Sequence, residues 1–248
     1  MATSNPVLGD KVFEEMRHID GSGNVMTIDG SVNKVGILLA IVLFTAYFSW
    51  NSFSAGGSMS SIMPWIAIGG IGGFITAMVT IFKKEWSPVS APVYAGFQGL
   101  FLGGFSAYMN SIYTGIVFDA VSLTLLILFG LLFVYKSRII KVTENFKMGI
   151  FVATFGIAGV YLMSFVLGMF GMNIPYIHEN GLIGIGFSLV VVVIASMNLI
   201  LDFDFIEKGA DRRLPGYMEW YGAFGLMVTL IWLYIEILKL LAKLRSRR

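Results

Sequence analysis

Two aspartates at the end of a long apolar run are the strongest candidates for chemistry in this sequence. The run extends from 182 to 201, and Asp202 and Asp204 follow it within the segment NLILDFDFIEKG. A membrane helix tolerates an acid where the acid reaches water, pairs with another group or serves a function. We therefore expect an ion or proton pathway near these two residues.

Helical geometry separates the two acids. Residues two apart are rotated by about 200° around a helix, so Asp202 and Asp204 cannot both face one interface. Asn198 lies four residues before Asp202 and shares its face, whereas Asp204 shares a face with Glu207. We expect Asp202 to be the interior acid and Asp204 to lie nearer the solvated end. The alternative is that both are ordinary acids at a helix end, although acids there face the negative end of the helix dipole.

A third acid could join them. Glu219 opens the last apolar segment on the same predicted side of the membrane, so the three carboxylates could meet at an inner mouth. Carboxylates held close together cannot all ionise cheaply, and such a cluster binds a proton near neutral pH. When deprotonated, it offers the oxygen ligands that suit Ca²⁺, with Asp202 as the candidate ligand. The residues fit a proton-regulated cation path and a proton relay equally well.

Other polar residues in the apolar segments are secondary candidates. Gln98 is expected near mid-membrane, where a hydrogen bond between helices is its most common role. Asp119 is expected at the outer end of its helix as an interface acid. Glu236 is expected toward the outside in an ion pair with Lys239, three residues further on. His178, in an outer loop, is a weak candidate for sensing.

Composition bounds the class of protein. The chain has 248 residues, of which 56% are hydrophobic and 13% charged, whereas soluble domains carry about 25% charged residues. A polytopic membrane protein is therefore expected. The absence of cysteine excludes disulfides and thiolate metal sites, and two histidines disfavour a histidine zinc site. No GxSxG or HExxH motif is present, so we expect neither an enzyme nor a cofactor.

Seven apolar segments are long enough to cross a membrane, because a span needs about 20 apolar residues. Short connections make them one all-α domain over 35–242, between a polar arm at 1–34 and a basic tail at 243–248. The predicted spans are 35–51, 60–82, 88–109, 114–135, 147–171, 182–204 and 218–242.

Lysine and arginine positions predict the orientation. They fall in the N-terminal arm and in alternate loops, which places the N-terminus in the cytoplasm. Seven spans then put the basic tail outside, so the last segment is either a full span, which its length favours, or re-entrant. Recurring glycines in the segments indicate close helix packing, and the spacing of Gly99 and Gly103 is also a weak dimerisation signal.

Four segments carry a resemblance to a known family. They are GFQGLFLGGFS at 96–106, FDAVSLTLLILFGL at 118–131, NLILDFDFIEKG at 198–209 and YMEWYGAFGLMVTLIWLYIEILKLL at 217–241. Together with seven spans joined by short loops, they resemble the bacterial branch of the Bax-inhibitor-like family, also called the transmembrane Bax inhibitor motif family.

The resemblance implies a seven-helix bundle in which outer helices surround the seventh, and a pH-sensitive calcium leak in membrane calcium homeostasis. It also implies a sensor of two acids, one in the sixth helix and one in the seventh. The first corresponds to Asp202. The second position falls on Thr229 or on Glu236, depending on the alignment, and Asp204 or Glu219 could replace a missing partner.

The acids and the resemblance together lead us to expect one of two functions. The first is a proton-gated Ca²⁺ leak in a bacterial inner membrane, with the lipid bilayer, Ca²⁺ and protons as partners and no nucleic acid. The second is a non-conducting regulator that binds another membrane protein, such as a protease, through its cytoplasmic arm.

Overall fold

The computed structural model describes residues 25–56, 59–171 and 181–247. His178 and most of the predicted N-terminal arm lie outside these residues. The described chain is built of seven long helices and one short 3-10 helix. They are α2 (Ile28–Gly56), α3 (Met59–Phe82), η1 (Lys84–Trp86), α4 (Ser87–Ile112), α5 (Ile116–Lys136), α6 (Glu144–Met169), α7 (Leu182–Asp211) and α8 (Met218–Arg245).

The seven predicted spans correspond to these seven helices, and six of them are long and apolar enough to cross a membrane. The helix outside this set is α4. It has 26 residues, enough for about 39 Å of helix, but its serines, glycines, Gln98 and Asn110 lower its hydropathy. Membrane crossing by α4 therefore stays a prediction.

The ends of two helices differ from the expected ones. Helix α2 begins at Ile28, seven residues before the predicted start at 35. Helix α7 continues to Asp211, seven residues beyond the predicted end at 204, so the expectation that Asp202 and Asp204 lie at the end of this helix was wrong. The segment FIEKGAD contains no proline, and Pro215 follows only after the helix has ended. Asp202 therefore does not face the negative end of the helix dipole, which acts within the last turn.

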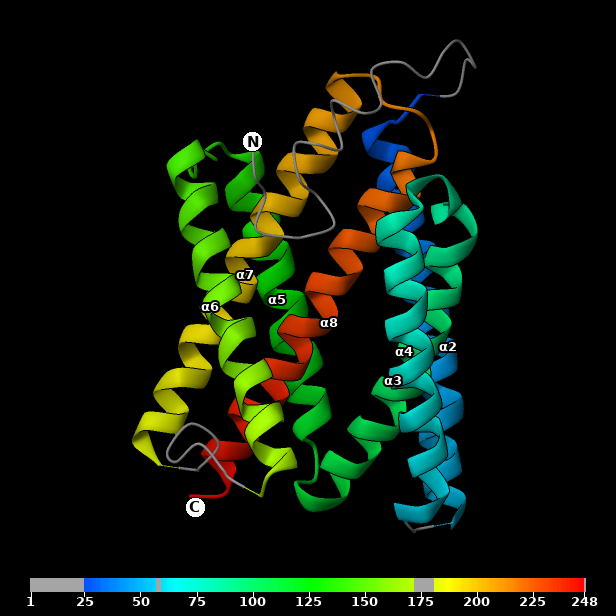
Figure 1. Ribbon diagram of the computed structural model, residues 1–248, viewed down its shortest axis with the longest axis vertical. Coiled ribbons are helices and arrows are strands. Elements are labelled where there is room, and N and C mark those ends of the chain that lie inside the picture. Colours follow the sequence, from blue (N-terminus) through cyan, green and yellow to red (C-terminus); the bar gives the residue numbers. More distant parts are fainter. Residues whose placement is uncertain (1–24, 57–58, 172–180, 248) are drawn as a thin grey trace. The chain divides into compact units, whose positions relative to one another are not determined.

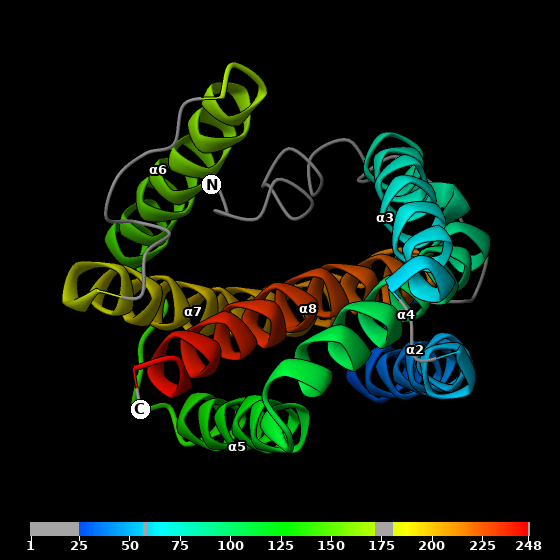
Figure 2. The same ribbon diagram turned by 90° about the horizontal axis from the view of Figure 1, so that it is seen from below.

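The described residues form two compact units, which are considered separately. The first contains α2, α3, η1 and α4 together with Asp204–Val228, the end of α7 and the start of α8. Helices α2 and α3 both pack along α4, as both ribbon views show (Figures 1 and 2).

Glycines explain the close approach of these three helices. A Cβ atom at Gly99 or Gly103 of α4 would overlap the backbone carbonyl of Val42 or Ala46 in α2. A Cβ atom at Gly69 of α3 would likewise meet the backbone of α4. The Gly99–Gly103 spacing thus serves packing within the chain.

Helix packing does not explain every glycine. Added Cβ atoms at Gly96, Gly156, Gly159 and Gly186 would meet nothing within 4 Å. For these four positions, the expectation of close packing was wrong, and nothing in the structure accounts for glycine there.

The second unit contains Phe118–Phe203, which forms most of α5, all of α6 and most of α7, together with α8 from Thr229 onward. Helices α6 and α7 run antiparallel. The Asn198 side chain of α7 donates to Thr154 of α6 at 2.9 Å, and the rings of Phe187 and Tyr161 lie 6.2 Å apart.

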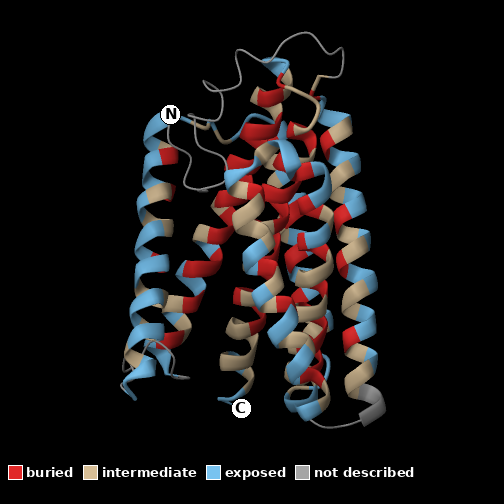
Figure 3. Ribbon diagram, turned by 45° about the vertical axis from the view of Figure 1, so that its right-hand side comes forward, coloured by how far each residue is buried: buried red, intermediate tan, exposed pale blue. Residues whose placement is uncertain are grey.

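Burial is unequal among the candidate spans. Helix α8 is the most buried of the six and α6 the least. Figure 3 shows exposed and buried residues alternating around the helices. Many of the exposed residues are large and apolar, including Phe44, Phe74 and Phe133, as expected for surfaces that face lipid. The arrangement of the outer helices around α8 stays a prediction.

The close contact of α4 with α2 gives a test of the packing. Gly103→Ala should lower the stability of the protein by about 1–3 kcal/mol, because the new methyl group would overlap backbone atoms that cannot move alone. Gly96→Ala, on the same helix, should be neutral or stabilising by up to about 1 kcal/mol. Thermal unfolding in detergent measures both. Equal unfolding temperatures for the two variants would contradict the α2–α4 interface.

Candidate functional site

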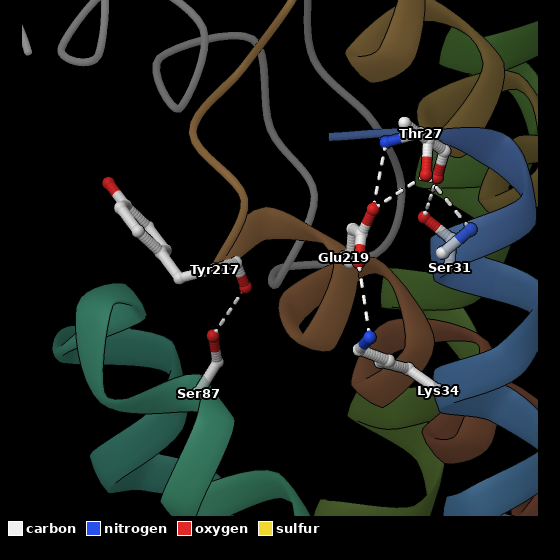
Figure 4. Close-up of polar contacts among 7 residues, drawn as sticks. Thr27, Ser31, Lys34, Ser87, Tyr217 and Glu219 are labelled. Atoms are coloured by element: carbon white, nitrogen blue, oxygen red, sulfur yellow. Dashed lines mark hydrogen bonds and ion pairs between the residues drawn. The ribbon is translucent and has the colours of Figure 1, made fainter. Parts of the chain in front are cut away.

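The carboxylate of Glu219 is the best-defined polar site near the start of α8. One of its oxygens accepts hydrogen bonds from the Thr27 backbone N–H at 3.0 Å and from the Thr27 hydroxyl at 2.7 Å. The other oxygen lies 3.4 Å from Nζ of Lys34 (Figure 4). Glu219 is buried, and these contacts connect the first turn of α8 to the first two turns of α2.

The start of α2 is built to receive this anion. Thr27 immediately precedes α2, and its hydroxyl oxygen accepts from the N–H of Gly30 at 2.9 Å, as a helix cap does. The positive end of the helix dipole stabilises a carboxylate placed there. Glycine at position 30 leaves space for the Glu219 carboxylate, because a Cβ atom at this position would overlap it. Glu219 is therefore a fixed, charge-compensated group.

Neighbouring contacts hold the same region in place. The Met26 N–H donates to the Leu214 carbonyl at 2.7 Å, and the Ser87 hydroxyl donates to the Tyr217 carbonyl at 2.8 Å (Figure 4). Burial, followed by the nearby Glu85 carboxylate, raises the pKa of Tyr217 above its ordinary value. Its phenol therefore stays neutral at physiological pH.

Asp204 differs from the expectation that it lies at a solvated helix end. Its side chain is buried, and one carboxylate oxygen lies 2.7 Å from Nζ of Lys208, one turn further along α7. The long lysine side chain can reach back along the helix, which allows the acid to be buried with its charge balanced. Helical rotation alone could not predict this, because α7 continues beyond the predicted end.

Asp202 is the most deeply buried acid among the residues that the structure describes. Its relative exposure is 0%, and Asn198, one turn earlier on the same face, is also buried. The Asn198 amide donates to the Thr154 hydroxyl of α6 and to the Ile194 carbonyl, both at 2.9 Å. The interior position predicted for Asp202 is confirmed by this burial.

Glu236 forms a second polar site, within the unit that contains Asp202. The predicted ion pair with Lys239 is present at 3.1 Å, and Glu236 also accepts from the Tyr161 hydroxyl of α6 at 2.9 Å. Glu236 is 2% exposed, so the acid is buried with two donors.

The distance along the helices separates Glu236 from Asp202. Tyr161, the partner of Glu236, lies seven residues beyond Thr154 on α6, or about 10.5 Å, in the direction away from Asp202. Glu236 is therefore held at another level of the bundle and does not supply the second acid beside Asp202.

The two remaining candidates occupy ordinary structural positions. Asp119 lies in the first turn of α5, is 46% exposed at its side chain and pairs with Arg245 near the end of α8. Gln98 lies against α3, where a Cβ atom at Gly73 would come within 2.6 Å of its amide nitrogen.

Three polar residues at these sites were not singled out from the sequence as site residues. Thr27 precedes the predicted first span, and a threonine directly before a helix is a recognisable capping signal. Tyr161 carries no local signal for its contact with Glu236. Lys147 lies at the start of its predicted span, at 147–171, where a lysine is ordinarily solvated, yet its side chain is 2% exposed.

Within the residues that the structure describes, no three His, Cys, Asp or Glu side chains gather to hold a metal ion. Ca²⁺ takes six to eight oxygen ligands in proteins. Asp202, Asp204 and Glu219 are thus not brought together as a resident calcium site in this structure.

The Glu219 site gives a second test. Gly30→Ala should displace the carboxylate from Thr27 and cost about 1.5–3 kcal/mol, the usual value of hydrogen bonds to a charged group. Gly36→Ala is the control, because a Cβ atom there meets nothing within 4 Å. Thermal unfolding in detergent measures the difference.

Repeating the Gly30→Ala substitution in a Glu219→Ala protein shows whether its effect depends on Glu219. In a Glu219→Ala protein, Gly30→Ala should cost nothing further, because the group it displaces is gone. A full additional loss in that background would show that the glycine acts through another contact.

A comparison with protein families identifies the chain at the level of its family. The family described as Bax inhibitor 1 like matches residues 5–246, nearly the whole sequence. No curated protein and no solved structure matches. The match spans all seven helices and both buried polar sites, and the chain belongs to the Bax inhibitor 1 like family.

Proposed function

We propose that this protein is a pH-sensitive cation leak, for Ca²⁺ in particular, in which Asp202 is the group that responds to protons. Family membership supports a membrane regulator or a channel. The observation that carries the finer proposal is the complete burial of Asp202 inside a candidate span. An acid at such a depth is costly and is retained in membrane proteins chiefly for function.

Among the described residues no three His, Cys, Asp or Glu side chains gather to hold a metal ion, so we propose a transient cation rather than a resident one. Deprotonated Asp202 offers hard oxygen ligands, and a few oxygens with exchangeable water allow an ion to enter and leave. The proposed role is therefore one of passage, without a cofactor and without enzymatic chemistry.

Asp204 and Glu219 are accessory groups in this proposal. Each is buried and titratable, but each has a lysine within 3.4 Å. A cation could use either carboxylate only after the lysine moved away. Gating that involves these acids would therefore require a change in the helix ends that carry them.

The proposed setting is a bacterial inner membrane with the N-terminus in the cytoplasm. The support is the distribution of Lys and Arg along the sequence, which favours a cytoplasmic N-terminus. In that orientation α8 carries the basic tail to the outside. Helix α4 would then be the third of seven spans.

Reconstitution tests the leak directly. Vesicles loaded with a calcium dye should show Ca²⁺ entry that changes between pH 6 and 8, by at most about tenfold per pH unit if a single carboxylate is responsible. Asp202→Asn should abolish most of this pH response. Asp119→Asn, which alters an exposed acid paired with Arg245, should retain it. An unchanged pH response in Asp202→Asn would refute the proposed role.

The alternative function is a non-conducting regulator of another membrane protein. The observation that favours it is that Asp204, Glu219 and Glu236 are each paired with lysine, as structural charges are. Deletion of the N-terminal arm tests it by pull-down of bound membrane proteins. The deletion should stop before Val25, because Met26, Thr27 and Lys34 contact the rest of the described chain. Loss of partners with an intact vesicle leak supports a separate regulatory role.

A further inference from the structure

We propose that Lys147 of α6 is the cationic partner of Asp202 of α7, and that this ion pair holds the two helices together at one level of the membrane. The pair would balance the negative charge of Asp202 inside the protein. Its existence is independent of conduction, whereas its role in gating rests on the proposed leak.

The register of α6 against α7 supports this pair. Thr154 and Asn198 are in contact at 2.9 Å. On α6, Lys147 lies seven residues before Thr154, which is about 10.5 Å along the helix. On α7, Asp202 lies four residues after Asn198, which is about 6 Å in the same direction because the helices are antiparallel. These steps place the two charged residues within about 5 Å of the same level.

A second contact gives the same register. The Tyr161 and Phe187 rings lie 6.2 Å apart. Lys147 is fourteen residues from Tyr161, and Asp202 is fifteen residues from Phe187, so the two paths differ by only about 1.5 Å. Two separate contacts between α6 and α7 therefore place Lys147 and Asp202 at nearly the same level.

Lys147 and Asp202 also lie on the sides of α6 and α7 that contact each other. Residues seven apart on a helix differ in direction by only about 20°, so Lys147, Thr154 and Tyr161 form one stripe along α6. The buried Ile150 and Ile157 fall on the same stripe, while most of the remaining surface of α6 is exposed. On α7, Asp202 is rotated from Asn198 by only about 40°.

Burial shows that Lys147 needs compensation inside the protein. Lysine is almost never fully buried unless it is paired, and this side chain is 2% exposed. Glu144 lies 3.3 Å from its Nζ, but the Glu144 side chain is 54% exposed at the start of α6. We assign the main compensation to Asp202, which is buried to the same extent.

Helix α5 contributes one ionisable phenol near this level, and the connection that follows it contributes one cation. From α5, Tyr135 packs its ring 5.8 Å from that of Phe203, the neighbour of Asp202, and the Arg138 guanidinium lies 5.8 Å from the Tyr135 ring. On α7 itself, Asp204 is paired with Lys208.

From α8, the residue at this level is Thr229. Lys243 contacts Ser188 at 2.9 Å, and Thr229 and Asp202 are each fourteen residues from that contact in the same direction. Thr229 is buried and cannot carry a charge. Helix α8 therefore supplies no charged partner for Asp202 at this level, and Lys147 is the buried cation that we assign to it.

The pair suggests how protons could act on the bundle. Removing the charge of one partner from a buried ion pair leaves the other uncompensated, which is strongly unfavourable. Protonation of Asp202 would leave Lys147 as a buried cation and would favour separation of α6 from α7 at this level. That separation is the gating step that we assign to the proposed leak.

Cross-linking tests the proximity without measuring transport. The chain contains no cysteine, so introduced thiols are unique. The Lys147→Cys/Asp202→Cys protein in membranes should be cross-linked by a short bifunctional thiol reagent. Met148→Cys/Asp202→Cys is the control, since Met148 is adjacent in sequence but exposed. Failure of the first pair to cross-link, or equal cross-linking of both, would overturn the proposal.

Charge variants provide a second readout that does not require cross-linking. Lys147→Met and Asp202→Asn should each lower the unfolding temperature in detergent, and the double variant should regain most of the loss. Glu144→Gln should change it little. Additive losses in the double variant, or a larger loss for Glu144→Gln than for Asp202→Asn, would contradict the assignment. A protein that shows the coupling but no leak would refute the proposed function alone.

Discussion

The structure depends on one constraint, which is that a charge buried in an apolar bundle must be compensated within the protein. Removing charges from water costs several kcal/mol per ion, and good pairing is needed to recover this free energy. Glu219, Asp204 and Glu236 are buried and each lies within 3.4 Å of a lysine. Two of these acids also connect helices, because Glu219 bonds to Thr27 before α2 and Glu236 bonds to Tyr161 of α6.

The way in which each buried carboxylate has its charge balanced also indicates its role. Glu219 and Glu236 are each held by a lysine and by a hydrogen-bond donor from another segment, so that they act as structural charges. Asp202 is buried most deeply and lies within α7, away from both helix ends. In the proposed pair with Lys147, its charge is balanced across the α6–α7 interface, so that a proton taken up at Asp202 alters helix packing directly. The proton-responsive gate would thus lie at the α6–α7 interface.

The sequence predicted the helices better than it predicted the polar contacts. Hydropathy located all seven helices, because long apolar segments leave few alternatives. It placed the end of α7 too early, since FIEKGAD is polar but remains helical to Asp211. Spacing along a helix predicted the Glu236–Lys239 pair, but contacts between helices, such as Glu219 with Thr27, depend on a register that no local pattern contains.

The proposed leak requires that Asp202 gains and loses a proton in the physiological range. Infrared difference spectroscopy of the protein in lipid measures this most directly, because a protonated carboxyl has a carbonyl band that a carboxylate lacks. We predict that such a band appears as the pH is lowered from 8 to 6 and is absent in the Asp202→Asn protein. A difference spectrum that is identical in the two proteins would contradict the claim.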